Sequence, residues 1–286
     1  MQFLELPSRY GMLAAISWGH PAAEPVIALH GWLDNAASFS RLAPQLVDVL
    51  PGYRIIAVDL PGHGHSPHLL MGSHYPFWTW SEVLMDLLTF FGRPLHVIGH
   101  SMGAGAALLV AGSCPELFRS LVSIDSLGPV VNRPEEAVHQ FRRAMLEGDG
   151  RISSGFRTIE EALSLRLRAN TWLDREQVMP VVERNLEQRA GRWHWRTDPR
   201  LRNHSRLRFS EDMLTGFLQG ACQPFLMLQA SHGLLDEALV KQRFAYLPSA
   251  TGQVVQGHHH CHLDPASLPG LLTAISMFWQ ESCSGN

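Results

Sequence analysis

A short run in the middle of the chain carries the most specific chemical signal, Gly99-His100-Ser101-Met102-Gly103. Apolar, β-branched residues precede it and small residues follow it, which is typical of a strand that turns sharply into a helix. Such a turn exposes the serine hydroxyl at the edge of a sheet, and glycines on both sides let strand and helix pack closely. The helix N-terminus directs N–H groups and partial positive charge toward an anion beside Ser101. We therefore predict that Ser101 is a nucleophile.

A serine hydroxyl needs a general base, and one late loop offers several histidines. When the nucleophile lies on this kind of turn, its base comes from a loop after the last strands, so His258, His259 and His260 are candidates. A metal site is the rival interpretation, because histidine and the nearby Cys261 are good ligands. Adjacent residues of one loop cannot all converge on one ion, and the sequence has no obvious second ligand cluster. We therefore predict no metal and no cofactor.

The acid that orients the base has two candidates. Asp125 ends the strand that comes after the helix following Ser101, which places its carboxylate at the same edge of the sheet as Ser101. Asp236 follows the next strand but could instead cap the helix after it. We favour Asp125 and keep Asp236 as the alternative.

An oxyanion hole requires two backbone N–H groups that face the nucleophile. Met102, directly after Ser101, should supply one, and Trp32, in the turn that follows an early buried strand, should supply the other. We also predict that His30, Gly31 and His100, which flank these groups, contact the substrate. The glycine-rich loop at residues 59–66 contains two histidines, and we interpret it as structural, with polar side chains that satisfy its own backbone.

Strands and helices alternate along most of the chain, which predicts a mostly parallel sheet flanked by helices. The expected strands are Phe3–Leu6, Leu13–Trp18, Pro25–Leu29, Tyr53–Val58, the strand before Ser101, Leu121–Ile124, Phe225–Leu228 and Gln253–Val255. The first two should form a hairpin at the edge of the sheet. The expected helices of this part are Ser38–Leu50, Trp80–Phe91, the helix after Ser101, about Glu237–Tyr246, and Ala266–Trp279.

About a hundred residues after Asp125 show no strand pattern and favour helices. The helical stretches are Gln140–Leu146, Thr158–Ala169, Arg175–Gln188 and Glu211–Gln219. We predict a helical cap over residues 129–221, inserted between a core of residues 1–128 and its continuation at residues 222–286. Sixteen of the 22 arginines fall in this region, which could mean an anionic substrate or merely a solvated face. The position of Arg200, Arg202, Arg206 and Arg208 should distinguish these two interpretations.

Composition excludes several classes of protein. The 286 residues are 45% hydrophobic and carry a net charge of −3, which argues against binding to nucleic acid or to an anionic membrane. The first residues lack a basic segment followed by a long apolar one, so we predict no signal peptide, no membrane span and a cytoplasmic location. The cysteines are scattered without a C-x-x-C pair, which predicts free thiols in a reducing compartment.

With these residues placed, the chain resembles the α/β-hydrolases, and more narrowly the serine hydrolase-like family. The narrow resemblance lies in His30–Phe39, in His232-Gly233 with Asp236, and in Asp198–Arg202. It implies an α/β-hydrolase fold with a helical cap over the substrate pocket. In hydrolases of this shape the run His259-x-x-His262-x-Asp264 has its first histidine as base, which favours His259. The acid mostly lies in the loop that holds Asp236 here, so that alternative stays open.

The expected activity is hydrolysis of a carboxylic ester, lactone or thioester, a small-molecule acyl substrate, through an acyl-enzyme on Ser101. Within enzymes, C–C bond hydrolysis, acyl transfer and perhydrolysis use the same three residues and remain alternatives. From another class, a ligand-binding protein could retain the fold. The sequence gives no prediction of oligomeric state.

Overall fold

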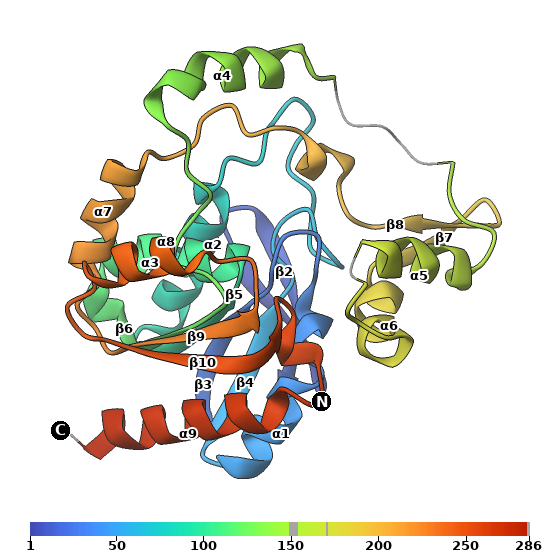
Figure 1. Cartoon of the computed structure of the whole chain (residues 1–286). Helices are drawn as coiled ribbons and strands as arrows, with labels where there is room; N and C mark the ends of the chain where they lie inside the picture. The colour runs from blue at the N-terminus through green and yellow to red at the C-terminus, as the bar shows by residue number, and fades with distance from the viewer. Residues whose placement is uncertain (149–153, 170, 285–286) are drawn as a thin grey trace.

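The computed structural model describes residues 1–148, 154–169 and 171–284, and within them one large sheet organises the molecule (Figure 1). The sheet has eight strands in the order β1-β2-β4-β3-β5-β6-β9-β10. Strands β4, β3, β5, β6, β9 and β10 run parallel, and β2 is antiparallel to both of its neighbours, β1 and β4. The strands are β1 (Gln2–Ser8), β2 (Gly11–Trp18), β3 (Glu24–Leu29), β4 (Tyr53–Val58), β5 (Leu95–His100), β6 (Phe118–Ile124), β9 (Phe225–His232) and β10 (Ala250–His258). The predicted mostly parallel sheet with an edge hairpin is confirmed.

Residues along each central strand alternate between two apolar cores, which explains why helices cover both faces of the sheet. In β3, Ile27 and Leu29 pack with α2 (Trp78–Phe91) and α3 (Met102–Ser113), whereas Val26 and Ala28 pack on the opposite face. That opposite face is covered by α1 (Leu42–Val49) and α9 (Leu268–Ser284), which lie together in Figure 1. The chain forms an α/β-hydrolase fold.

The parallel order brings the carboxyl ends of β3, β4, β5, β6, β9 and β10 to one edge of the sheet. The chain segments that leave these ends carry most of the predicted site residues. Open α/β sheets bind their ligands at this edge, because the connecting loops there are free to vary. The topology therefore gathers residues that are far apart in the sequence.

The segment between β6 and β9 forms a separate layer above this edge (Figure 1). It contains α4 (Ala137–Leu146), α5 (Ile159–Arg168), α6 (Arg175–Arg184), β7 (Leu186–Arg189), β8 (Arg192–Trp195) and α7 (Glu211–Gly220). Helices α5 and α6 and the β7–β8 hairpin share a small apolar core, in which α5 packs on α6. By contrast, α7 packs against α3, and its Leu214 and Leu218 belong to the core of the sheet. The division of the chain at residues 129 and 221 remains a proposal.

The absence of strands from this segment was a wrong prediction, since β7 and β8 pair as an antiparallel hairpin. The helix expected over Arg175–Gln188 ends at Arg184, and the chain enters β7 at Leu186. The turn at Ala190-Gly191 has positive φ at both residues, 47° and 76°, as a tight hairpin requires. Alternate tryptophans at Trp193 and Trp195 were the signal that sequence reasoning missed.

Smaller differences concern the ends of elements. The helix expected over Ser38–Leu50 is divided into a short 3₁₀ turn, Ala36–Phe39, and α1. The strand expected over Gln253–Val255 extends to Ala250–His258, because it pairs along most of its length with β9. Helix α8 (Glu237–Phe244) lies close to its expected range. Among the described helices none is long and apolar enough to cross a membrane.

Candidate active site

The backbone at Ser101 makes the sharp turn that the sequence predicts. Ser101 has φ 49° and ψ −115°, a conformation that L-residues rarely adopt, between the end of β5 and the start of α3. A Cβ atom on Gly99 would lie 2.3 Å from Cα of Ala104, and one on Gly103 would lie 2.4 Å from the carbonyl oxygen of Leu29. Larger residues cannot occupy these two positions without displacing backbone, so both glycines are needed to form the turn.

Ser101, His259 and Asp125 are in hydrogen-bond contact. Nδ1–H of His259 donates to Oδ2 of Asp125 at 2.6 Å, which leaves Nε2 to accept from Oγ of Ser101 at 2.9 Å. The side chain of His259 is 9% exposed, and that of Asp125 is completely buried. The acceptor at Nδ1–H fixes the tautomer and the orientation of the ring, so that Nε2 faces Oγ of Ser101.

Asp125 is held by backbone on the side away from His259. Its carboxylate accepts hydrogen bonds from the N–H group of Ala230, near the end of β9, and from that of Leu234, in the loop after β9, each at 3.1 Å. The backbone φ at Asp125 is 49°, and a Cβ on Gly233 would lie 2.3 Å from its Oδ1. The loop after β9 therefore closes around the carboxylate and fixes its direction.

The alternative acid and bases have other partners. Asp236 caps α8, where its Oδ1 accepts from the N–H of Leu239 at 3.1 Å. The ring of His258 stacks on Trp172 at 5.5 Å, and Nε2 of His260 lies 3.3 Å from Oδ2 of Asp34. Among the contacts of the described residues, none therefore joins Asp236, His258 or His260 to Ser101.

The two N–H groups predicted to form an oxyanion hole belong to segments beside Ser101. Met102 is the first residue of α3, where the N–H group has no acceptor within its own helix. Gly31 lies against the nucleophile, since a Cβ on it would be 3.4 Å from Cβ of Ser101. Next to Trp32, Leu33 has φ 61°, and its N–H donates to Nε2 of His63 at 3.2 Å. The loop after β3 is thus held in a strained form by a histidine that sequence analysis assigned to structure alone.

His30 and His100 were predicted to contact the substrate, but the structure buries both completely. Nδ1–H of His30 donates to the carbonyl of Gly31, and its Nε2 accepts from the N–H of Leu60. Nε2–H of His100 donates to the carbonyl of His259 at 2.8 Å. Both side chains are therefore suited to holding the backbone of the site, rather than to touching a ligand. Burial lowers their pKa, that of His100 strongly because three other histidines surround it.

One group of residues has the composition of a metal site. Ligand atoms of Asp34, His100 and His260 lie within 4.8 Å of one another. The carboxylate of Asp34, however, already forms an ion pair with Arg166 of α5. A divalent cation would face that guanidinium group at close range, so the arrangement does not fit a metal.

Two buried ion pairs join the segment between β6 and β9, which is the predicted cap, to the rest of the molecule, here called the core. Arg184 of α6 reaches Asp59, with its Nε 3.0 Å from both carboxylate oxygens, and Arg166 reaches Asp34. The N–H groups of Ala36 and His65 also donate to Asp59, both at 2.7 Å. The expectation that the loop at residues 59–66 satisfies its own backbone holds in part, but its bond to the cap was not foreseen.

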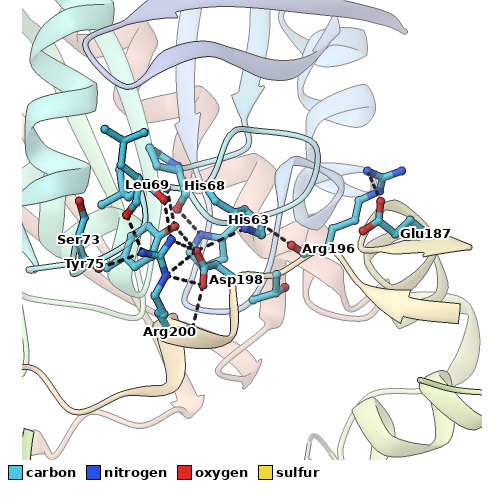
Figure 2. A network of polar contacts seen from close by, with 12 residues as sticks. His63, His68, Leu69, Ser73, Tyr75, Glu187, Arg196, Asp198 and Arg200 are labelled. Carbon is cyan, nitrogen blue, oxygen red and sulfur yellow. Dashed lines mark hydrogen bonds and ion pairs between the residues drawn. The ribbon is translucent and has the colours of Figure 1, made fainter. Parts of the chain in front are cut away.

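A third contact between cap and core is the network in Figure 2. Asp198 accepts from the hydroxyl of Tyr75 at 2.8 Å, and the guanidinium group of Arg200 donates to the same carboxylate. Arg200 also donates to the carbonyls of Leu69 and Ser73. Arg200 thus anchors the cap to the loop at residues 68–75.

The other three arginines of the cluster divide between two cavities. Arg202 lines a small cavity of about 30 Å³ with Leu33 and Arg166. Arg206 and Arg208 line a larger one of about 270 Å³ near the start of α4. The arginines therefore serve different surroundings and do not form a single patch.

A family model described as the α/β-hydrolase fold matches residues 24–266. The chain belongs to the α/β-hydrolase family. This α/β-hydrolase is 28% identical to a serine hydrolase-like protein of Dictyostelium discoideum over 276 aligned residues. The alignment covers 89% of this chain and 75% of that protein. It is 27% identical to a serine hydrolase-like protein of Danio rerio, over 98% of this chain and 91% of the other.

Solved structures agree with this assignment. A hypothetical protein of Pseudomonas aeruginosa has a TM-score of 0.88 and 32% identity, over 98% of this chain and all of the other. A thioesterase domain from the curacin biosynthetic pathway has a TM-score of 0.83 and 24% identity, over 97% of this chain and 99% of that domain, which shows a shared fold. The family expected from the sequence is confirmed, and with it a hydrolase.

Proposed function

We propose that this α/β-hydrolase cleaves a carboxylic ester, lactone or thioester through an acyl-enzyme on Ser101. The observation that carries the proposal is the continuous hydrogen-bonded arrangement Ser101–His259–Asp125 at 2.9 and 2.6 Å. Three residues from three separate loops in this order supply nucleophile, base and orienting acid. The serine hydrolase-like names of the relatives support the same reaction class.

The chemistry follows from the tautomer of His259. Its Nε2 takes the proton from Oγ of Ser101 as the oxygen attacks the carbonyl carbon, and a tetrahedral intermediate forms. The negative oxygen receives hydrogen bonds from the N–H groups of Trp32 and Met102. His259 then gives the proton to the leaving oxygen or sulfur, the bond to the leaving group breaks, and the acyl group remains on Ser101.

Deacylation repeats these steps with water as nucleophile. His259 removes a proton from the water, the oxygen adds to the acyl carbon, and the proton returns to Oγ of Ser101 as the acid product leaves. Asp125 keeps Nδ1 of the ring protonated throughout and stabilises the imidazolium form that appears twice in the cycle.

Hydrolysis of 4-nitrophenyl esters of increasing acyl length tests the proposal. We expect turnover by the wild type and a loss of kcat of about 10⁴-fold or more in Ser101→Ala, since removing the nucleophile leaves only binding and the oxyanion hole. Ser113→Ala is the matched control, because its hydroxyl lies at the far end of the same helix and donates to the carbonyl of Leu109. Its activity should equal that of the wild type.

A fluorophosphonate separates a wrong substrate from a wrong mechanism. Labelling of the wild type and of Ser113→Ala, but not of Ser101→Ala, is expected whether or not a given ester is turned over. A wild type that neither hydrolyses any ester nor reacts with the fluorophosphonate would contradict the proposal and favour a ligand-binding protein.

A further inference from the structure

The segment that follows β3 is bound to the cap through its side chains. This segment, residues 31–39, contains Trp32 and is called here the oxyanion loop. Nε1–H of Trp32 donates to a carbonyl of the cap at 3.0 Å, and Nδ2–H of Asn35 donates to another at 2.8 Å. Between them in the chain, the carboxylate of Asp34 pairs with Arg166 of α5. The loop that carries one proposed oxyanion donor is therefore held by the cap.

The carboxylate of Asp34 is almost completely buried, and its two oxygens face different partners. Oδ1 pairs with the guanidinium group of Arg166, and Oδ2 lies 3.3 Å from Nε2 of His260. Burial by itself raises the pKa of Asp34, but the charge of Arg166 and then His260 outweigh it, so the pKa lies below its ordinary value. The carboxylate therefore stays ionised and lies between the cap and the loop of the proposed base.

The loop that carries His259 has further contacts around this residue. The carbonyl of His259 accepts a hydrogen bond of 2.8 Å from Nε2–H of His100. His260 comes next in the chain and faces the buried carboxylate. Two residues later, Nε2 of His262 lies 2.8 Å from Oγ of Ser38, which belongs to the oxyanion loop. A hydrogen bond tolerates only a narrow range of distance and angle, so the bond from the ring of His259 to the nucleophile depends on the backbone that these neighbours hold.

We propose that Asp34 is a positioning residue for the reaction, an inference that rests on the proposed function. Arg166 of the cap holds the carboxylate of Asp34, and that carboxylate holds His260. His260 in turn fixes the backbone from which the ring of His259 reaches the nucleophile. Asp34 also lies two residues after Trp32, so one carboxylate joins the loop of the oxyanion donor to the loop of the base. The cap thus aligns both parts of the site.

The other buried ion pair between cap and core provides a comparison. Arg184 of α6 meets Asp59, whose carboxylate is as deeply buried as that of Asp34. Among the contacts of the described residues, none joins Arg184 or Asp59 to the loop of His259. Loss of this pair should therefore lower stability and leave the base in place.

Steady-state kinetics with the 4-nitrophenyl ester that the wild type turns over best test the proposal. Asp34→Asn should lower kcat by about 10- to 100-fold with little change in KM, because a small displacement of the base slows proton transfer without weakening substrate binding. Arg184→Met is the matched control and should keep the wild-type kcat. Circular dichroism and thermal unfolding establish that each variant is folded at the assay temperature.

A double-variant cycle tests whether Asp34 acts through His260. His260→Gln should lower kcat to a similar extent, and the variant with both substitutions should be no slower than the slower single one, because the two residues act as a unit. Independent contributions would multiply instead. Arg166→Lys should retain more of the wild-type kcat than Arg166→Gln, since lysine keeps a positive charge beside Asp34.

The outcomes separate this proposal from the proposed function. An active wild type with an unchanged kcat in Asp34→Asn, or losses that multiply in the double variant, would overturn the positioning role and leave ester hydrolysis intact. A loss of kcat in Arg184→Met as large as in Asp34→Asn would assign the effect to the cap as a whole and would also overturn it. A wild type that neither hydrolyses esters nor reacts with the fluorophosphonate would refute the hydrolase mechanism itself.

Discussion

Two carboxylates at the same edge of the sheet have nearly the same surroundings and different partners. Asp59 directly follows β4 and Asp125 directly follows β6, and both are almost completely buried. Each accepts hydrogen bonds from two backbone N–H groups. Asp59 then meets the guanidinium group of Arg184, whereas Asp125 meets the imidazole of His259.

The partner decides what each carboxylate can do. A guanidinium group keeps its proton at any pH at which the protein is folded, so the Asp59–Arg184 pair is a fixed bond between core and cap. An imidazole has two nitrogens, and the second nitrogen of His259 faces Ser101, where it can accept a proton and pass it on in the proposed reaction. The two carboxylates therefore occupy equivalent positions at the edge of the sheet. Only the partner decides whether a carboxylate anchors another segment or takes part in the proposed chemistry.

The sharpest test of this comparison is the carboxylate of Asp125, which we propose orients His259. Asp125→Asn should lower kcat for 4-nitrophenyl esters by about 10³–10⁴-fold with little change in Tm, because an amide no longer favours the tautomer and imidazolium form of His259. The measurement is steady-state kinetics together with thermal unfolding.

Asp236→Asn is the control, since asparagine also caps helices well. Its kcat should stay within about twofold of the wild type. A large loss in Asp236→Asn with little in Asp125→Asn would reverse the assignment of the acid.

The anchoring carboxylate should show the opposite pattern. Arg184→Met should lower the free energy of unfolding by about 3–5 kcal/mol, because it leaves Asp59 charged and buried without a partner. Urea unfolding, followed by fluorescence of the tryptophans, measures this.

Arg175→Met provides the comparison, as Arg175 also belongs to α6 but pairs with Glu160 in solvent. It should leave the free energy of unfolding almost unchanged. Equal stability of the two variants would mean that the buried pair does not hold the cap to the core.

The buried histidines predict a smaller effect that depends on pH. Burial lowers the pKa of His63 and His262 to about 3 and that of His96 to about 4. In the unfolded chain these rings titrate near 6.5, so these three rings alone account for the uptake of about three protons on unfolding at pH 5. Their contribution to stability is complete above pH 6.5 and is lost as the pH falls toward these lower values, by on the order of 1 kcal/mol per pH unit for each ring.

Calorimetric unfolding in buffers with different heats of ionisation counts these protons. His262→Gln should reduce the uptake at pH 5 by about one proton. A free energy of unfolding that does not change between pH 6.5 and pH 5 would contradict the inferred burial of neutral rings.

Local sequence was enough to indicate the sharp turn at Ser101 and the parallel sheet. The glycines around Ser101 and the change from β-branched to small residues specify a strand, a turn and a helix within a few positions. Alternating strands and helices then allow few topologies other than a parallel sheet, which brings the loops of Trp32, Ser101 and His259 to one edge.

Only the tertiary structure distinguishes which of several chemically equal side chains lie in contact with one another beside Ser101. Asp125 and Asp236 both follow strands, and three consecutive histidines share one loop, so residue type and order could not distinguish them. The loop after β9 closes around Asp125 and leaves Asp236 at the start of α8.

The same holds for the cap. Its arginines look alike in the sequence, yet Arg184 is buried against Asp59, Arg200 donates to the carbonyls of Leu69 and Ser73, and Arg202 lines a small cavity with Leu33. Each position depends on which polar groups the fold brings within reach of a long, flexible side chain. That distance is a property of packing between segments far apart in the chain, which local patterns do not encode.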